Sequence, residues 1–149
     1  MCKALDVANY IVNTIPVDNL KLQKLLYYSQ AVHMVLNKSF DEPLFLEDIE
    51  AWTYGPVVPS VYRKYKSNGF NTIPAKGLKC SLNPNEIKTI DIVLSYYGSM
   101  SGVELVSKTH QEEPWRSVYD EHKKNNIITK RSIFNYFNSC LSFSENETN

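Results

Sequence analysis

Apolar residues recur at helical spacing in the first quarter of the chain. This spacing predicts a helix over residues 4–15, and the proline that follows ends it because the residue before a proline avoids the α region. A second helix is expected over residues 18–37, with Asp18 as its N-cap. Gln23 and Gln30 lie on a different face of this helix from its leucines, so we predict that it is amphipathic.

The middle of the chain has a pattern that is typical of strands. Apolar and polar residues alternate over residues 49–54, which predicts a short strand that Gly55 and Pro56 break. Pro59 is well placed to open a third helix, which an Asn-Gly pair then closes. Residues 70–74 are predicted to form a second short strand beside the first.

Local capping signals predict further helical segments in the second half of the chain, at residues 83–97, 101–110, 114–119 and 129–141. The whole pattern indicates a mainly α fold, a compact single domain of about six helices with a small two-stranded β ribbon. We expect this domain to cover residues 1–141, and the polar residues 142–149 to form a disordered C-terminal tail.

The composition fits one globular domain and shows no excess of either charge. Its 149 residues are 43% hydrophobic and 21% charged, with 16 basic and 16 acidic side chains. A domain of this size can build a core without metals or disulfides. Because the net charge is zero, few phosphates can be neutralised, and specific DNA binding is not expected.

Cysteine use and the first residues indicate a cytoplasmic protein. Cys2, Cys80 and Cys140 are far apart and form no Cys-x-x-Cys pair, so we expect three reduced thiols. Asp6 interrupts the apolar run that a signal peptide needs. The longest uncharged stretch, residues 92–103, is too short to span a bilayer, and no membrane contact is expected.

Signatures of the common enzyme classes are absent from the sequence. We therefore expect no enzyme activity, no catalytic residues, no metal and no cofactor; an unrecognised site that combines histidine with glutamate or cysteine is the enzymatic alternative. His33 is expected to be a buried, hydrogen-bonded side chain, and His110 to bond the last carbonyls of its helix. Glu112 and Glu113 are expected to be solvated charges, because adjacent residues do not face each other.

Residues 62–66, Tyr-Arg-Lys-Tyr-Lys, alternate aromatic and basic side chains. This pattern is found in proteins that bind single-stranded nucleic acid. It is equally typical of a helix whose tyrosines pack inward while its charges face water. The chain holds ten tyrosines, and exposed tyrosines suit a protein interface.

Three segments together resemble a known family. Residues 21–30 are similar to its amino-terminal K-L-Q-K-L-L-Y-x-x-Q signature. Residues 50–62 resemble its E-A-W-x-x-G-P-V-x-P-x-V-Y block, and residues 109–115 resemble its T-H-x-x-x-P-W block. In this order the blocks are similar to those of the Panacea antitoxin domain family, also known as SocA-like or phage-associated GepA-like proteins. The resemblance covers about residues 4–138.

This resemblance implies an antitoxin of a bacterial or phage toxin–antitoxin system, carried for example by a prophage. Its expected partner is a cognate protein toxin, and small alarmone-synthetase-like toxins occur among the partners of the family. Neutralisation is expected to occur by direct protein contact. The alternatives are a proteolytic adaptor that delivers the toxin to a protease, and a nucleic-acid-binding regulator. The family brings no established catalytic residues.

The residues that carry the resemblance are expected to be mainly structural; they are Leu22, Lys24, Leu25, Tyr28, Trp52, Gly55, Pro56, Val57, His110, Pro114 and Trp115. At least one of the two tryptophans should anchor the core, with its indole N–H donating to a carbonyl.

Toxin binding is expected at other positions. We predict Tyr62, Arg63 and Tyr65 as contact residues, because these types are frequent among the side chains that dominate interface energies. Partner specificity is expected in the loops over residues 38–45 and 68–79.

Overall fold

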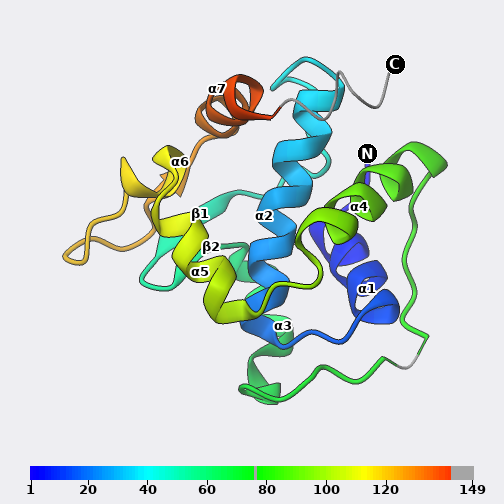
Figure 1. The fold of residues 1–149 in the computed structure, drawn as a ribbon. Coiled ribbons are helices and arrows are strands. Elements are labelled where there is room, and N and C mark those ends of the chain that lie inside the picture. Colours follow the sequence, from blue (N-terminus) through cyan, green and yellow to red (C-terminus); the bar gives the residue numbers. More distant parts are fainter. Residues whose placement is uncertain (76, 142–149) are drawn as a thin grey trace.

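Helix α2 (Asn19–Leu36) runs through the middle of the molecule in the computed structural model, which describes residues 1–75 and 77–141 (Figure 1). Five of the other helices and one strand of the described residues pack against α2. The prediction of a disordered tail at residues 142–149 lies outside the described residues.

The described residues form a mainly α fold with a small antiparallel sheet, as predicted. Besides α2, the elements are α1 (Ala4–Thr14), β1 (Ile49–Trp52), β2 (Gly55–Val57), α3 (Pro59–Tyr65), a 3₁₀ turn (Lys66–Asn68), α4 (Pro84–Tyr97), α5 (Gly102–His110), α6 (Glu113–Arg116), β3 (Ile127–Ile128) and α7 (Lys130–Cys140).

Side-chain caps start most of the longer helices where the sequence predicts them. Asp18 Oδ1 accepts the backbone N–H of Lys21 at 2.8 Å at the start of α2. Asn83 and Ser101 open α4 and α5 with complete capping boxes, and Thr129 caps α7. These caps satisfy N–H groups that the first turn of a helix leaves without a partner.

The sheet has the strand order β2–β1–β3. The first predicted strand is present as β1, but its partners are β2 and β3 and not the predicted residues 70–74. Gly55 and Pro56 do not end the β structure: they begin β2, which pairs with β1 after a turn at residues 53–54. Residues 70–74 form no strand, and the Ile73 N–H donates instead to the Val17 carbonyl at 2.8 Å.

Helix α2 is buried on all sides, which contradicts the prediction of an amphipathic helix. Among its residues only Leu20, Lys21 and Leu36 are not buried. Several of its polar side chains are tolerated because they bond backbone groups of neighbouring segments, as a buried polar group requires; Gln23, Lys24 and Gln30 do so.

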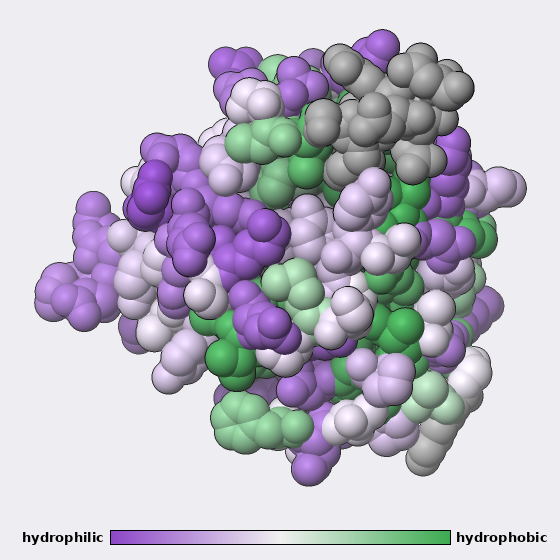
Figure 2. Space-filling model, in the orientation of Figure 1, coloured by the Kyte–Doolittle hydropathy of each residue, from purple (hydrophilic) through white to green (hydrophobic). Residues whose placement is uncertain are grey.

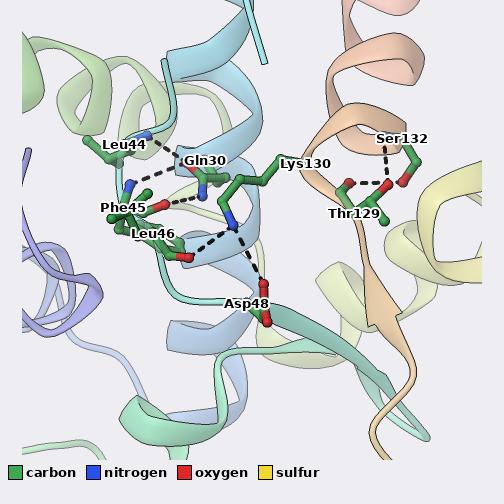
Figure 3. Close-up of polar contacts among 8 residues, drawn as sticks. All are labelled: Gln30, Leu44, Phe45, Leu46, Asp48, Thr129, Lys130 and Ser132. Carbon is green, nitrogen blue, oxygen red and sulfur yellow. Dashed lines mark hydrogen bonds and ion pairs between the residues drawn. The ribbon is translucent and has the colours of Figure 1, made fainter. Parts of the chain in front are cut away.

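Gln30 is an example of this arrangement (Figure 3). Its amide oxygen accepts the Leu44 N–H at 2.7 Å, and its amide nitrogen donates to the Phe45 carbonyl at 2.8 Å. At the start of α7, Lys130 Nζ donates to the Leu46 carbonyl at 3.0 Å and lies 3.7 Å from Asp48 Oδ1 (Figure 3). The loop between α2 and β1 is thus fixed from α2 and from α7.

The three cysteines are free: Cys2 is buried, Cys80 half-buried and Cys140 exposed. In the part of the chain that the structure describes, no helix is both long and apolar enough to cross a membrane.

Candidate partner-binding site

The three segments that carry the family resemblance meet in space, although they are far apart in the sequence. They contribute α2, the β1–β2 hairpin, and the end of α5 with α6. Strand β2 lies between α2 and α5 and contacts both. This meeting point forms the base of a surface groove described below.

Lys24 of α2 is fully buried at this junction. Its Nζ donates a hydrogen bond to the Pro56 carbonyl at 3.0 Å, and it takes part in no ion pair among the described residues. Burial lowers the pKa of its ammonium to about 7, because the charged form loses its hydration, and Asp18 opposes this shift. Lys24 therefore holds β2 against α2 at a cost in stability.

Gly55 allows the hairpin to approach Lys24 closely. Its φ of +104° lies in a region that side chains with a Cβ rarely adopt. A Cβ at this position would lie 2.7 Å from Lys24 Cε and 2.8 Å from Thr109 Oγ1. Next to it, the Gln23 side chain accepts the Val58 N–H at 2.9 Å. Glycine is therefore required here by both conformation and space.

Trp115 confirms the prediction that a tryptophan anchors the core. It is 9% exposed, and its indole N–H donates to the Trp52 carbonyl at 2.8 Å. Its ring stacks on His110 at 4.0 Å and on Tyr119 at 4.6 Å between ring centroids. The Trp115 ring thus connects α6 to the β1–β2 hairpin and to α5.

The prediction that His110 bonds the last carbonyls of its helix is wrong. The end of α5 is closed by the Gln111 N–H, which reaches the carbonyls of Lys108 and Thr109. The His110 ring instead lies flat against Trp115. Burial lowers the pKa of His110, and a bond to the backbone of Thr53 partly offsets that change. His33, in contrast, is buried and bonds Thr89 Oγ1 at 2.8 Å, as expected.

Glu112 is buried, so its assignment as a solvated charge is also wrong, whereas Glu113 is exposed. The Tyr28 hydroxyl donates to the Glu112 carboxylate, 3.1 Å from both oxygens. Burial raises the pKa of Glu112 to about 7, with Tyr28 and Lys108 opposing the rise. The sequence pattern missed this group because Glu112 lies in the short link between α5 and α6, where helical spacing says nothing about burial.

The remaining residues that carry the resemblance are also buried; they are Leu22, Leu25, Tyr28, Pro56, Val57 and Pro114. Trp52 is half-buried, and its indole N–H donates to Glu50 at 2.9 Å. Most of these side chains are therefore out of direct reach of a partner.

A groove of about 800 Å³ lies over this junction, bordered by α3 and by the segment between α6 and β3. We call it the aromatic groove, after the five rings that line it: Trp52, Tyr54, Tyr62, Phe70 and Tyr119. Tyr54 is 67% exposed and Phe70 is 91% exposed. Exposed rings that gather in one groove, in contrast to scattered ones, mark an interaction or ligand site.

The predicted contact residues Tyr62, Arg63 and Tyr65 do not share one face of α3: the first two lie at the surface and Tyr65 lies in the core. Tyr62 lines the aromatic groove and packs edge-on against Trp52 at 5.0 Å, and Arg63 beside it is exposed. Tyr65 is only 6% exposed, and its hydroxyl donates to Asn9 Oδ1. The Tyr65 side chain therefore packs into the core and leaves little for a partner to contact.

Sequence reasoning did not single out Tyr54, Phe70 or Tyr119 as members of one surface. Phe70 lies in the loop over residues 68–79, where partner specificity was expected. No sequence pattern pointed to Tyr119, because its place in the groove depends on its stacking against Trp115. Within the described residues no group of three His, Cys, Asp or Glu side chains could hold a metal ion.

Comparison with known proteins gives two matches. Residues 22–116 match the family model described as antitoxin SocA-like, Panacea domain. The antitoxin SocA of Caulobacter vibrioides (strain NA1000 / CB15N) is 33% identical over 114 residues, which cover 68% of this chain and 59% of that protein. The chain thus spans less than two thirds of the length of this relative. No solved structure matches.

Proposed function

This chain belongs to the Panacea family of SocA-like antitoxins, and on that premise we propose that it neutralises a cognate protein toxin by binding it directly. The observation that supports direct binding is the aromatic groove, which carries two strongly exposed rings, Tyr54 and Phe70. Rigid, exposed aromatic side chains supply contact area at low entropic cost, and they dominate the energies of many interfaces. We place this activity in the cytoplasm.

The toxin contacts are proposed to centre on the outer rings of the aromatic groove. Tyr62 and the neighbouring Arg63 remain proposed contact residues, and Tyr54 and Phe70 join them because of their exposure. Tyr65 is proposed instead as a packing residue. The buried residues that carry the resemblance, Lys24 and Gly55 among them, are proposed to hold the hairpin that forms the base of the groove.

We propose that neutralisation needs no catalysis by this chain. A toxin whose active surface is covered becomes inactive at equal molar amounts, without turnover. An interface of ordinary size, about 1,600 Å² in total, would be enough for a stable complex. An alarmone-synthetase-like enzyme is one toxin type that this proposal includes.

Growth rescue tests this proposal. Each small open reading frame adjacent to the gene is expressed as the candidate toxin, with and without this chain, in cells that have or lack their ATP-dependent proteases. We expect rescue in both strains and co-purification of the two proteins. Rescue without a complex in the protease-deficient strain would contradict direct inhibition, and rescue only in the protease-containing strain would establish the adaptor mechanism instead.

A matched pair of variants connects the rescue to the aromatic groove. Phe70→Ala removes an exposed ring from the groove, and we expect it to weaken rescue. Val103→Ala removes an exposed apolar side chain (74% exposed) that does not line the groove, and we expect full rescue. Equal rescue by both variants would place the toxin contact elsewhere on the protein.

A further inference from the structure

We propose that the aromatic groove receives an acidic segment of the toxin, whose apolar side chains enter the groove while its carboxylates meet Lys66, Lys123 and Lys124. This inference rests on the proposed function and adds the chemistry of the partner. It is based on the charged side chains that line the groove: the acidic ones have partners within the protein, and the exposed lysines have none among the described residues.

The acidic side chains that line the groove already have partners within the protein. Glu50 accepts the indole N–H of Trp52 at 2.9 Å. Asp120 accepts the backbone N–H of His122 at 2.9 Å, and the Glu121 carboxylate lies 3.4 Å from the His122 ring. Each of these three carboxylates therefore already has a hydrogen-bond or ion-pair partner within the protein.

Apart from the buried Lys24, the basic side chains that line the groove have no hydrogen-bond or ion-pair partner among the described residues. Lys66 follows α3, and Lys123 and Lys124 lie across the groove on the segment between α6 and β3; all three are exposed. The ion pairs among the described residues use other cations, namely Lys108, Arg116, His122 and Lys130. Figure 2 shows hydrophilic side chains projecting from the left edge of the molecule, over the segment that joins α6 to β3. Unpaired charges at both borders favour a partner of opposite sign.

Between these cations the groove offers apolar surface. Its volume of about 800 Å³ suits a few inserted side chains, and the exposed Phe70 ring would lose contact with water on binding. An acidic segment that carries apolar residues satisfies both features: it covers the rings, and its carboxylates neutralise the cations at both borders.

A nucleic acid fits this surface less well than a peptide does. Binding of single strands relies on free aromatic faces on which bases stack. Here one face of Tyr119 is covered by Trp115, and Trp52 and Tyr62 pack edge-to-face against each other.

An NMR titration of the purified protein tests the chemistry of the partner. The probes are an octapeptide of alternating glutamate and leucine, the same peptide with lysine in place of glutamate, and an oligothymidine octamer. We expect the acidic peptide to shift the amide signals of residues 66–70 and 119–125, with binding that weakens as salt is added. Absence of these shifts, or stronger binding of the basic peptide or of the oligonucleotide, would overturn the inference.

Charge reversal supplies the matched control. We expect the double variant Lys123→Glu/Lys124→Glu to bind the acidic peptide about tenfold more weakly than the parent protein. Lys79→Glu/Lys88→Glu changes the net charge equally at exposed positions outside the groove, and its affinity should stay within about twofold. Equal losses in the two variants would mean a non-specific charge effect and would overturn the inference.

The same variants separate this inference from the proposed function. If the toxin still binds Lys123→Glu/Lys124→Glu with parental affinity, the acidic-segment inference fails while the antitoxin function stands. If no candidate toxin forms a complex with the parent protein, the proposed function fails, whatever the peptide titration shows.

Discussion

At the scale of single residues, the structure buries two ionisable groups, Lys24 and Glu112, and the sequence pattern places the second of them at the surface. Lys24 has a backbone carbonyl as its hydrogen-bond partner, and Glu112 has the Tyr28 hydroxyl. Burial moves both pKa values to about 7, from opposite directions. Each group is therefore predicted to make the stability of the protein depend on pH, with opposite signs.

The Glu112→Gln variant should remove one of these dependences. The folded pKa of Glu112 is raised to about 7, so the folded state binds this proton more tightly, and stability falls as pH rises from about 4.5 to about 7. Glutamine keeps an acceptor for Tyr28 but carries no charge. We expect the variant to exceed the parent in free energy of unfolding by about 3 kcal/mol at pH 8 and to lose this advantage near pH 4.5.

Urea unfolding of both proteins across this pH range gives the measurement. The quantity to compare is the difference between variant and parent, because Lys24, His33 and His110 titrate in both. If the difference in free energy of unfolding between variant and parent does not change with pH, burial does not raise the pKa of Glu112.

Gly55→Ala should be far more damaging than the same change at another glycine with positive φ. The new Cβ would collide with Lys24 and Thr109, so we expect a loss of about 3 kcal/mol in free energy of unfolding. Gly69 also has positive φ, +58°, but nothing lies within 4 Å of its Cβ position. Gly69→Ala should lose only the cost of its backbone strain, about 1.5 kcal/mol. Equal losses in urea unfolding would contradict the close approach at Gly55.

At the scale of elements, local signals predicted the helices well, and long-range contacts decided what was missed. Asp18 and Thr129 cap helices through bonds to residues three positions ahead, so the sequence contains the whole interaction. The partner of β1 depends on which segments fold against it, and residues 70–74 had a plausible composition but the wrong neighbours. The burial of Gln30 likewise depends on a loop that starts after α2 has ended.

Gln30→Met tests whether polar side chains of α2 fix the loops around it. Methionine has a similar length, but it leaves the Leu44 N–H and the Phe45 carbonyl without their bonds. We expect a loss of about 3 kcal/mol in free energy of unfolding and faster hydrogen exchange at the Leu44 amide. Gln111→Met, at an exposed position, is the control and should change stability by less than about 0.5 kcal/mol. Unchanged exchange at Leu44 would contradict this role of Gln30.

At the scale of the whole molecule, we propose that folding and partner binding depend on largely different side chains. The residues that resemble the family blocks are mostly buried around α2 and the hairpin, while Phe70, Tyr119 and the exposed lysines of the aromatic groove lie outside these blocks. The sequence could identify the first set through the resemblance. It could not assemble the groove, because Trp52, Phe70 and Tyr119 come from three separate segments that only the fold brings together.

Two aromatic substitutions should show this division. Trp115→Ala removes a buried ring and its bond to the Trp52 carbonyl, so we expect a loss of about 4 kcal/mol in free energy of unfolding. Phe70→Ala removes an exposed ring and should change stability by less than about 0.5 kcal/mol. Thermal unfolding followed by circular dichroism measures both variants. A large loss for Phe70→Ala would mean that this ring supports the fold and is not free for a partner.

The most direct test of the account is a titration of the purified toxin with the purified protein, without any protease present. We predict that toxin activity falls linearly to zero at one molar equivalent, and that the two proteins elute as one complex in size-exclusion chromatography. Phe70→Ala should require an excess, whereas Val103→Ala should behave as the parent does. Full toxin activity at several equivalents of the folded parent protein would contradict neutralisation by direct binding.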